Sequence, residues 1–358
     1  MATLKAAIIG CGGIANGKHM PALKRNPNIE MVAFCDIVEE KATKAAKDFG
    51  AEGAVVCTDY KEILKDGSID ICYVLTPNRE HSFIAIDALG AGKHVMCEKP
   101  MAKTAEEGAA MCEAAKKSGK LLSIGYQNRY RADSLTLKRL CEEDELGEIY
   151  YAKAVAQRRR AVPTWGVFLD KDAQGGGPLI DIGTHALDLT LWLMNNYEPQ
   201  MVVGNVFYKL GKQTETANAW GDWDAETFDV EDSAFGHIVM KNGAVISLSA
   251  SWALNTLDVR EASCELCGTK AGADLRGELS LNGVKCNKQY TESFDLGAGG
   301  VAFFEGGGSS PEDVEAAIFI NAVLGKGELT VMPEQALVVT QILEAIYKSS
   351  ETDQPVYF

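Results

Sequence analysis

The chain has 358 residues, of which 46% are hydrophobic and 24% are charged, and its formal net charge is -15. These values are typical of a soluble globular protein with two domains, and the acidic balance argues against nucleic acid or an anionic membrane as the main partner, because either needs a basic surface. No apolar run approaches the ~20 residues that span a bilayer and no signal peptide precedes the first strand pattern, so we expect a cytoplasmic protein.

The first predicted strand covers residues 4–9 and ends in a glycine-rich stretch, which leads into a helical segment to about residue 25. The next strand, at residues 31–35, closes on Asp36. A strand, glycine-rich turn, helix, strand and terminal acid in this order are typical of a dinucleotide-binding unit. A carboxylate at Asp36 accepts ribose hydroxyls and repels a 2′-phosphate, which favours NAD over NADP. The predicted cofactor contacts are Gly10, Gly12, Gly13, Ile14 and Asp36.

Strands and helices continue to alternate up to residue 126. Further strands are predicted at residues 55–57, 69–75, 94–96 and 121–125, with helices at 39–49, 60–64, from 79, and at 105–117. Six strands that alternate with helices predict a doubly wound parallel sheet, which we place in a Rossmann domain at residues 1–126. The strand at 69–75 ends in polar residues that could line the cofactor, and a histidine that caps or packs follows them: Thr76, Pro77, Asn78 and His81.

The strand at residues 94–96 stops abruptly at Cys97-Glu98-Lys99-Pro100. Ligands of an open α/β sheet lie just beyond the carboxyl ends of its strands, so we expect Glu98 and Lys99 at the cofactor. Taken alone, this stretch is better explained as a strand end with a solvated ion pair. After the last strand, Gln127 is expected at the cofactor, and Asn128 and Arg129 are expected at substrate hydroxyls.

After residue 147 the pattern changes to strands without helices between most of them. Alternating segments at residues 149–157, 202–208, 233–240, 244–252 and 262–266 predict a mostly antiparallel open sheet, with Asn242-Gly243 as a hairpin turn. Helices at 311–324 and 333–349 could cover one face, and the other face could cover a partner subunit. We therefore expect an α+β domain at residues 127–358 and a homo-oligomer formed through its sheet.

The ten cysteines suit a reducing compartment. Several fall inside predicted buried strands, where a reduced thiol packs as a small apolar group. Cys264 and Cys267 have the spacing of a metal pair, but they fall in a strand pattern that sends them to opposite faces. Without a second pair or a nearby histidine, we expect no metal site.

A second chemical cluster is Asp181-Ile182-Gly183-Thr184-His185-Ala186-Leu187-Asp188. On a helix, Asp181, His185 and Asp188 share one face. A histidine flanked by carboxylates has a fixed tautomer and raised basicity, as a general base near neutral pH requires. A surface helix with a His–Asp pair explains the same spacing.

Three motifs together, Gly10-x-Gly12-Gly13-x-Ala15, Glu98-Lys99-Pro100 and Asp181-x-Gly183-x-His185-x-x-Asp188, resemble the Gfo/Idh/MocA oxidoreductase family along essentially the whole chain. The tail at residues 333–356 resembles the C-terminal helix of that family. The resemblance implies an NAD(P)-dependent enzyme that acts on secondary hydroxyls of sugars, glycosides or inositols. It also implies that Lys99 and His185 face each other across the substrate with Asp181 beside them, and that the Lys99–Pro100 bond is cis.

The implied roles agree with the chemistry of the side chains. An alcohol loses a proton as hydride leaves its carbon, and His185 can take that proton. The ammonium group of Lys99 can stabilise the developing alkoxide, and Asp181 can hold a substrate hydroxyl. The cofactor carries the redox chemistry.

Residues 158–166 lie on a loop that often reaches the cofactor or the sugar in this family. A tryptophan offers a flat face to a pyranose or an aglycone, whereas an arginine run is equally explained as a surface patch or a subunit contact. Trp220 and Trp223 could rim the pocket or an interface. The expected substrate contacts are Asn128, Arg129, Arg158, Arg159, Trp165, Asp181 and His185.

We therefore expect an NAD-dependent dehydrogenase that oxidises a secondary hydroxyl of a sugar, a glycoside (the 3-hydroxyl of a glucoside among them) or a cyclitol. Three alternatives stay open: an inositol dehydrogenase, an NAD-containing glycosidase without net redox change, and a non-enzymatic NAD-sensing protein on the same fold. The last would be expected to lose Lys99 or His185, and the chain retains both.

Overall fold

The computed structural model describes residues 3–296 and 310–358, and the chain divides into two compact units. The first unit comprises the chain through Gln127 together with a later segment that ends at Leu337. The second unit begins at Asn128 and resumes at Val338. The first division lies one residue beyond the expected one, but the segment that ends at Leu337 was expected in the second domain.

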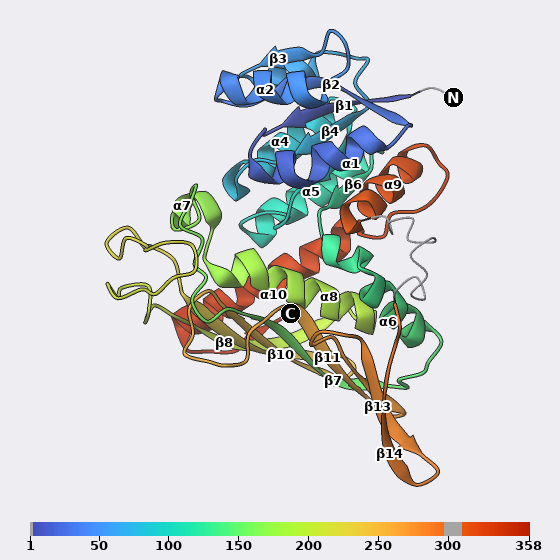
Figure 1. Cartoon of the computed structure of the whole chain (residues 1–358), viewed down its shortest axis with the longest axis vertical. Coiled ribbons are helices and arrows are strands. Elements are labelled where there is room, and N and C mark those ends of the chain that lie inside the picture. The colour runs from blue at the N-terminus through green and yellow to red at the C-terminus, as the bar shows by residue number, and fades with distance from the viewer. Residues whose placement is uncertain (1–2, 297–309) are drawn as a thin grey trace. The chain divides into compact units, whose positions relative to one another are not determined.

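The first unit is built on a six-stranded sheet in which all neighbouring strands are parallel (Figure 1). The order is β3-β2-β1-β4-β5-β6, as in the expected doubly wound sheet. The strand order reverses between β1 and β4, so the crevice for a ligand lies at their carboxyl ends. The strands are β1 (Leu4–Ile9), β2 (Ile29–Cys35), β3 (Val55–Cys57), β4 (Ile71–Val74), β5 (His94–Cys97) and β6 (Leu122–Ile124).

The helices of the first unit follow the strands in the expected alternation. In α5, the Thr104 side chain accepts from the Glu107 amide at the start, and Gly119 ends the helix in the left-handed region with φ 66°. The segment η1 is a π-helical turn that leads directly into α1. The helices are η1 (Ala15–His19), α1 (Met20–Arg25), α2 (Glu39–Phe49), α3 (Tyr60–Leu64), α4 (Asn78–Gly90) and α5 (Ala105–Ser118).

Helix α9 (Pro311–Val323) belongs to the first unit, although we expected it to cover the antiparallel sheet. Phe319 and Ile320 share one buried apolar cluster with side chains of β1, β2 and α1. Arg25 of α1 donates to the Asp313 carboxylate from Nε at 2.9 Å and from Nη2 at 2.6 Å. The apolar pattern predicted the helix correctly, but such a pattern does not specify which sheet a helix covers.

The second unit is built on a nine-stranded sheet with the order β14-β13-β12-β11-β7-β10-β9-β8-β15. Among the described strands of this sheet, only β7 and β10 pair in parallel, so the expected mostly antiparallel sheet is confirmed. The strands are β7 (Ile149–Gln157), β8 (Pro199–Phe207), β9 (Ser233–Met240), β10 (Val245–Ser251), β11 (Arg260–Gly268), β12 (Ala271–Asp274), β13 (Ser280–Lys285), β14 (Lys288–Ser293) and β15 (Val356–Tyr357).

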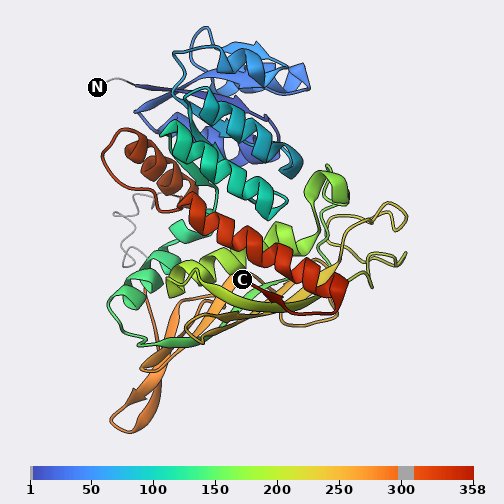
Figure 2. The same ribbon diagram turned by 180° about the vertical axis from the view of Figure 1, so that it is seen from behind.

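The two faces of this sheet differ in what they contact. Figure 2 shows α8 (Thr184–Met194) and α10 (Pro333–Thr352) on the same side of the sheet. A Cβ added at Gly204 of β8 or Gly236 of β9 would meet Ile346 of α10 at 2.8 and 2.6 Å, so the alternate residues of both strands face the other side. Phe207 and Phe235 lie on that outer face with their ring centroids 5.9 Å apart.

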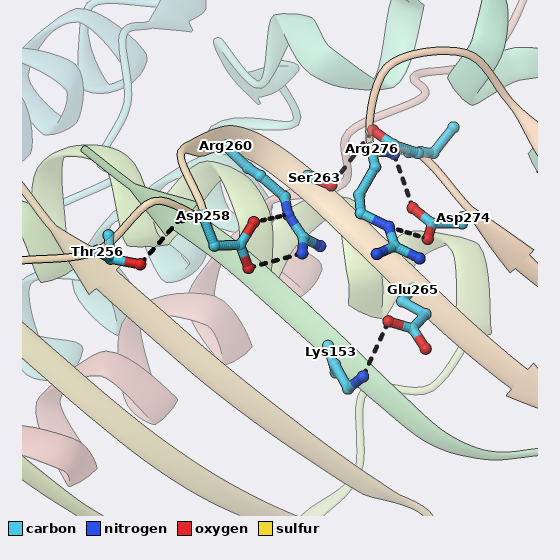
Figure 3. A network of polar contacts seen from close by, with 9 residues as sticks. Lys153, Thr256, Asp258, Arg260, Ser263, Glu265, Asp274 and Arg276 are labelled. Atoms are coloured by element: carbon cyan, nitrogen blue, oxygen red, sulfur yellow. Dashed lines mark hydrogen bonds and ion pairs between the residues drawn. The ribbon is translucent and has the colours of Figure 1, made fainter. Parts of the chain in front are cut away.

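Charged side chains also lie on the sheet near β7 and β11. Figure 3 shows Lys153 of β7 beside Glu265 of β11, with Lys153 Nζ 2.9 Å from Glu265 Oε2. Lys153 alternates with the fully buried Ala152 and Ala154, so it projects from the face opposite to theirs. The loop before β11 is held by Arg260, which donates to Asp258 from Nε and Nη2 at 2.5 and 2.6 Å (Figure 3).

Two further described helices of the second unit precede strand β7 and two follow it. Those before it are η2 (Gln127–Tyr130, which begins at the last residue of the first unit) and α6 (Ala132–Glu142). Those after it are α7 (Lys171–Gln174) and the π-helical turn η3 (Leu179–Gly183), which runs into α8.

None of the helices at residues 3–296 and 310–358 is long and apolar enough to cross a bilayer. All ten cysteine thiols are free.

Candidate active site

The glycine-rich turn after β1 has the shape that a dinucleotide requires. Gly10 has φ 94°, and a Cβ there would lie 2.5 Å from the Leu75 carbonyl oxygen, so only glycine fits. A Cβ added at Gly12 or Gly13 meets nothing within 4 Å. The backbone at these two positions is therefore open on one side, where a pyrophosphate can approach the amides at the start of the helix that contains Ile14.

Asp36 lies at the end of β2 and contacts the same turn. Its Oδ2 accepts from the Cys11 backbone N–H at 2.9 Å, and its Oδ1 accepts from the Val38 N–H at 2.9 Å. These two bonds fix the carboxylate beside the turn, with acceptor capacity left for ribose hydroxyls. The residues present thus fit the adenosine half of NAD.

The polar turn after β4 is tied to the turn after β5 by His81. Pro77 is the N-cap of α4, and Asn78 begins that helix. The His81 ring is fully buried, with Nε2 2.8 Å from the Thr76 carbonyl oxygen and Nδ1 2.8 Å from the Pro100 carbonyl oxygen. His81 therefore packs between the two turns, as one of the interpretations of the sequence anticipated.

Glu98 is a buried carboxylate that is hydrogen-bonded at both oxygens. Its Oε1 accepts from His19 Nε2 at 2.8 Å, and its Oε2 accepts from the Lys99 backbone N–H at 2.9 Å. Burial opposes the charged form, but the hydrogen bond and charge of His19 dominate and lower the pKa of Glu98 to about 2. The same contact raises the pKa of His19 against the effect of burial. Glu98 is thus a fixed anion and is unsuited to transfer protons near neutral pH.

Lys99 and Gln127, both predicted cofactor contacts, follow the last two strands of the parallel sheet, β5 and β6. The Lys99–Pro100 peptide bond is cis, as the resemblance implied. In the amide orientation that its neighbours require, the Gln127 oxygen accepts from Lys18 Nζ at 2.8 Å and its nitrogen donates to the Gly125 carbonyl at 3.0 Å. Lys18 precedes His19 on η1, so this π-helical turn contacts both Gln127 and Glu98.

The second unit holds Asp181 and His185 on one continuous helical stretch. Asp181 lies in η3 and His185 in the first turn of α8, where it is 9% exposed. Asp181 Oδ2 accepts from the indole Nε1 of Trp252 at 3.1 Å, which orients the carboxylate. The π-helical turn that contains Asp181 ends two residues before His185 and widens the helix, a feature that is frequent at functional sites.

Arg129 is a correction to the expected substrate contacts. Its guanidinium is fully buried and donates to Asp188 from Nε at 2.9 Å and from Nη2 at 2.6 Å. Both oxygens of Asp188 are used in this pair, so we also withdraw the expectation that Asp188 tunes His185. Breaking such a buried pair by removal of one partner is strongly destabilising, which indicates a structural role for both residues.

Aromatic rings lead from Asp181 to an exposed tryptophan pair. Phe168 lies 6.3 Å from Trp252 and 5.9 Å from Trp165, and Trp165 lies 5.1 Å from Trp220, all measured between ring centroids. Trp165 and Trp220 are 53% and 43% exposed. The predicted contact Trp165 is therefore joined to Asp181 through packed rings.

Two of the predicted loop residues are held within the second unit, Arg158 through its side chain and Arg159 through its main chain. Arg158 donates to Glu261 through Nε and Nη2, and its guanidinium lies 5.0 Å from the Trp220 ring. The Arg159 carbonyl accepts from the Leu254 N–H at 3.1 Å. Trp223 is buried against Phe228, so it does not lie on a rim.

Sequence reasoning missed three residues that support these groups. His19 is hydrogen-bonded to Glu98, and Trp252 donates a hydrogen bond to Asp181. Glu231 accepts from the Gly177 and Leu179 backbone N–H groups at 2.8 and 3.1 Å, at the start of η3. The only sequence signal for Glu231 is its position two residues before β9, and none of the three shares a local motif with its partner.

The parallel sheet, the glycine-rich turn and the acid at the end of β2 define the first unit as an NAD-binding Rossmann domain, and the second unit adds an α/β domain. The protein is therefore of the NAD-binding oxidoreductase class. The chain belongs to the Gfo/Idh/MocA oxidoreductase family: residues 4–126 match its NAD-binding Rossmann-fold domain, and residues 138–358 match its C-terminal α/β domain.

Relatives of this chain include proteins named as dehydrogenases. It is 37% identical to the D-glucoside 3-dehydrogenase of Escherichia coli K12. The matched region of 352 residues covers 98% of this chain and 96% of that protein. It is 30% identical over 194 residues to the inositol 2-dehydrogenase of Salmonella typhimurium LT2, with 54% and 55% covered. The structure of levoglucosan dehydrogenase with NADH and levoglucosan has the same fold, with a TM-score of 0.81, 24% identity and 99% of both chains covered.

Proposed function

We propose that the protein is an NAD-dependent dehydrogenase that oxidises the 3-hydroxyl of a D-glucoside to a ketone. The observation that carries the proposal is the 37% identity to D-glucoside 3-dehydrogenase over 98% of the chain. It is supported by the retention of Lys99, Asp181 and His185 in the motifs of the family. The similarity to an inositol 2-dehydrogenase favours a cyclitol as the second candidate substrate.

In this proposal the three residues act on one secondary alcohol. His185 takes the hydroxyl proton as general base, and the Lys99 ammonium stabilises the oxyanion that develops on the same oxygen. Asp181, oriented by Trp252, accepts a hydrogen bond from a neighbouring hydroxyl of the sugar. Bound NAD supplies the hydride acceptor. The alcohol thus loses one hydride and one proton and becomes a ketone.

We assign the specificity for the rest of the glycoside to the exposed tryptophans. Trp165 and Trp220 are partly exposed on the loops of the second unit, and exposed aromatic rings bind a flat sugar ring or an apolar aglycone. Asn128, Arg158 and Arg159 are kept as further substrate contacts in the proposal. Asp36 is assigned the preference for NAD over NADP.

The proposal is tested by following NADH formation with methyl and aryl D-glucosides, free sugars and inositols, each with NAD and with NADP. We expect turnover with glucosides and NAD, and losses on the order of 10²- to 10⁴-fold in kcat for Lys99→Ala and His185→Ala. Trp165→Ala is expected to raise KM for aryl glucosides more than for methyl glucosides. Retained NADH binding separates lost chemistry from lost folding.

Four outcomes of this screen would contradict the proposal or a part of it. Turnover of inositols alone would favour the second candidate. Release of aglycone without net NADH would indicate a redox-neutral glycosidase. Binding of NAD without reaction on any substrate would indicate a sensing protein. A preference for NADP would contradict the role given to Asp36.

We also propose that the protein is a cytoplasmic homo-oligomer that associates through the outer face of the nine-stranded sheet. The ten free thiols suit a reducing compartment. The outer face carries the Phe207–Phe235 pair, and one face of an open antiparallel sheet commonly serves as an interface.

A further inference from the structure

The main chain around Lys99 is held by two buried histidines from different helical segments. His19 is the last residue of η1 and is 6% exposed, and His81 lies in α4 and is 0% exposed. His19 contacts the residue before Lys99, and His81 contacts the residue after it. Neither histidine has a place in the chemistry proposed above.

On the amino side of Lys99, the Glu98 carboxylate connects His19 to the backbone. One carboxylate oxygen accepts from His19 Nε2 at 2.8 Å, and the other accepts from the Lys99 N–H at 2.9 Å. Both side chains of this pair are 6% exposed, so the hydrogen bond forms away from water, where charge-assisted bonds are strong. Without the His19 donor, the carboxylate can rotate and release the Lys99 amide.

The position of His19 is itself fixed by its surroundings. The ring packs 5.9 Å from the Tyr73 ring of β4, measured between centroids at an interplanar angle of 59°. In the wide turn of η1, two consecutive residues make these contacts: Lys18 donates to Gln127, and His19 is hydrogen-bonded to Glu98. The donor to Glu98 is therefore rigid, as a positioning group must be.

On the carboxyl side of Lys99, His81 holds the Pro100 carbonyl. Nδ1 lies 2.8 Å from the Pro100 oxygen, and Nε2 lies 2.8 Å from the Thr76 oxygen at the end of β4. The ring thus spans the turns that follow two neighbouring strands. A neutral imidazole has one N–H and an imidazolium has two, so the ring donates to one or both of these carbonyl oxygens, and a side chain without a ring N–H can donate to neither.

We propose that His19 and His81 are positioning residues for Lys99, His19 through the Glu98 carboxylate and His81 through the Pro100 carbonyl. The inference rests on the proposed function, in which the Lys99 ammonium stabilises the developing oxyanion. Lysine carries its charge on a flexible four-carbon stem, so the main chain must be held for the ammonium to meet a developing oxyanion. A displacement of about 1 Å can cost on the order of 10²-fold in rate.

The test compares His19→Leu and His81→Leu with the wild-type full chain. His94→Leu is the matched control, because His94 begins the same strand β5 at its opposite end and accepts from the Leu121 N–H at 3.1 Å. His19→Gln is the conservative variant, since its amide retains a donor for Glu98. Hydrogen–deuterium exchange of the peptide that contains Lys99 is measured without substrate, followed by kcat, KM and NADH affinity on glucosides.

We expect exchange at the Lys99 amide to be at least about tenfold faster in His19→Leu, and the turn around Pro100 to loosen in His81→Leu, seen as faster exchange of the same peptide. Peptides from β1 should be unchanged. Both variants should lose roughly 10- to 100-fold in kcat with little change in KM or NADH affinity. His19→Gln should lie between His19→Leu and the wild type, and His94→Leu should change neither the exchange of this peptide nor kcat.

Folded variants with wild-type exchange in this peptide would overturn the proposal, and so would faster exchange with kcat unchanged. A uniform increase of exchange over the whole first unit would also overturn it, because it would indicate general destabilisation. If the wild type oxidises no sugar, the proposed function fails, and the exchange comparison alone decides whether the histidines hold Lys99. If His19→Leu does not fold, His19→Gln and His81→Leu decide.

Discussion

At the scale of single residues, Gly10 and Gly12 serve the same turn in different ways. Gly10 has a positive φ and lies against the Leu75 carbonyl, so its lack of a side chain is required for folding. Gly12 has no neighbour within 4 Å of an added Cβ, so folding does not require a glycine there. What remains for Gly12 is the approach of the cofactor to the backbone.

This difference predicts opposite results for two alanine substitutions. Gly10→Ala should lower the free energy of unfolding by about 1–3 kcal/mol or more, because it strains the backbone and clashes with Leu75. Gly12→Ala should leave unfolding unchanged and weaken NADH binding by roughly tenfold or more, because its methyl group lies where the pyrophosphate approaches. Chemical denaturation and fluorescence titration with NADH measure the two effects. Normal NADH affinity in Gly12→Ala would contradict the placement of the cofactor at this turn.

Sequence motifs predict the roles of residues that act together within one short stretch of chain. The glycine-rich turn and Asp36 are linked by a strand–helix–strand unit of about 30 residues, so their spacing is informative. Arg129 and Asp188 are 59 residues apart, and nothing in either neighbourhood indicates that they pair. The substrate role expected for Arg129 was wrong for this reason.

At the scale of elements, α9 brings a carboxyl group from late in the chain to the first unit. Glu315 of α9 is 3% exposed, and burial raises its pKa to about 8. The charged or titratable groups around it are His19 and Lys18 of η1, Glu98, Glu312 of the same helix, and Tyr73 of β4. Glu315 is therefore neutral in the folded protein at pH 7 and ionised in the unfolded chain.

Glu315 predicts a loss of stability as the pH rises. Below the ordinary pKa of 4.5 the carboxyl is neutral in both states and has no effect; between pH 4.5 and 8 only the unfolded chain releases the proton, so the free energy of unfolding falls. The full difference is on the order of 4–5 kcal/mol at and above pH 8. Glu315→Gln should therefore match the wild type near pH 5 and exceed its stability by several kcal/mol near pH 9.

Thermal or chemical unfolding from pH 5 to pH 9 measures this difference. Glu312→Gln on the same helix is the control. Its free energy of unfolding should not rise above that of the wild type as the pH increases from 5 to 9. A constant difference between Glu315→Gln and the wild type over this range would show that Glu315 is ionised in the folded protein.

Elements with strong periodicity were predicted closely, and those without it were missed. The strand at residues 149–157 and the helix at 39–49 have the predicted bounds. The strands β12, β13 and β14 were not predicted, because β12 has only four residues and most side chains of β13 and β14 are exposed. Exposed strands lack the apolar alternation from which a strand is inferred.

At the scale of the whole molecule, the outer face of the nine-stranded sheet carries the proposed contact between subunits. Phe235 lies on this face beside Phe207, and His237 and Val239 alternate with the buried residues of the same strand. A half-buried apolar pair on the outer face of an open sheet favours association.

We predict that the protein is a homo-oligomer in solution and that Phe235→Asp shifts it to a smaller species. The physical reason is that a carboxylate loses hydration when it is buried in an interface. Size-exclusion chromatography with light scattering measures the mass. Val55→Asp, at an exposed position of β3, is the matched control and should keep the wild-type mass. A monomeric wild type would contradict this part of the proposal.

The amino-acid sequence alone was sufficient for the strand and helix order of the Rossmann domain, for the glycine-rich turn after β1 and for the motifs of Lys99, Asp181 and His185, because these depend on residues close together in the chain. Only the tertiary structure shows that His19 holds Glu98 across 79 residues, that Arg129 pairs with Asp188, and that α9 packs on the first unit. Apolar periodicity specifies that a side chain is buried, and charge specifies that a buried side chain needs a partner. They do not specify the partner, which is determined by which segments pack together.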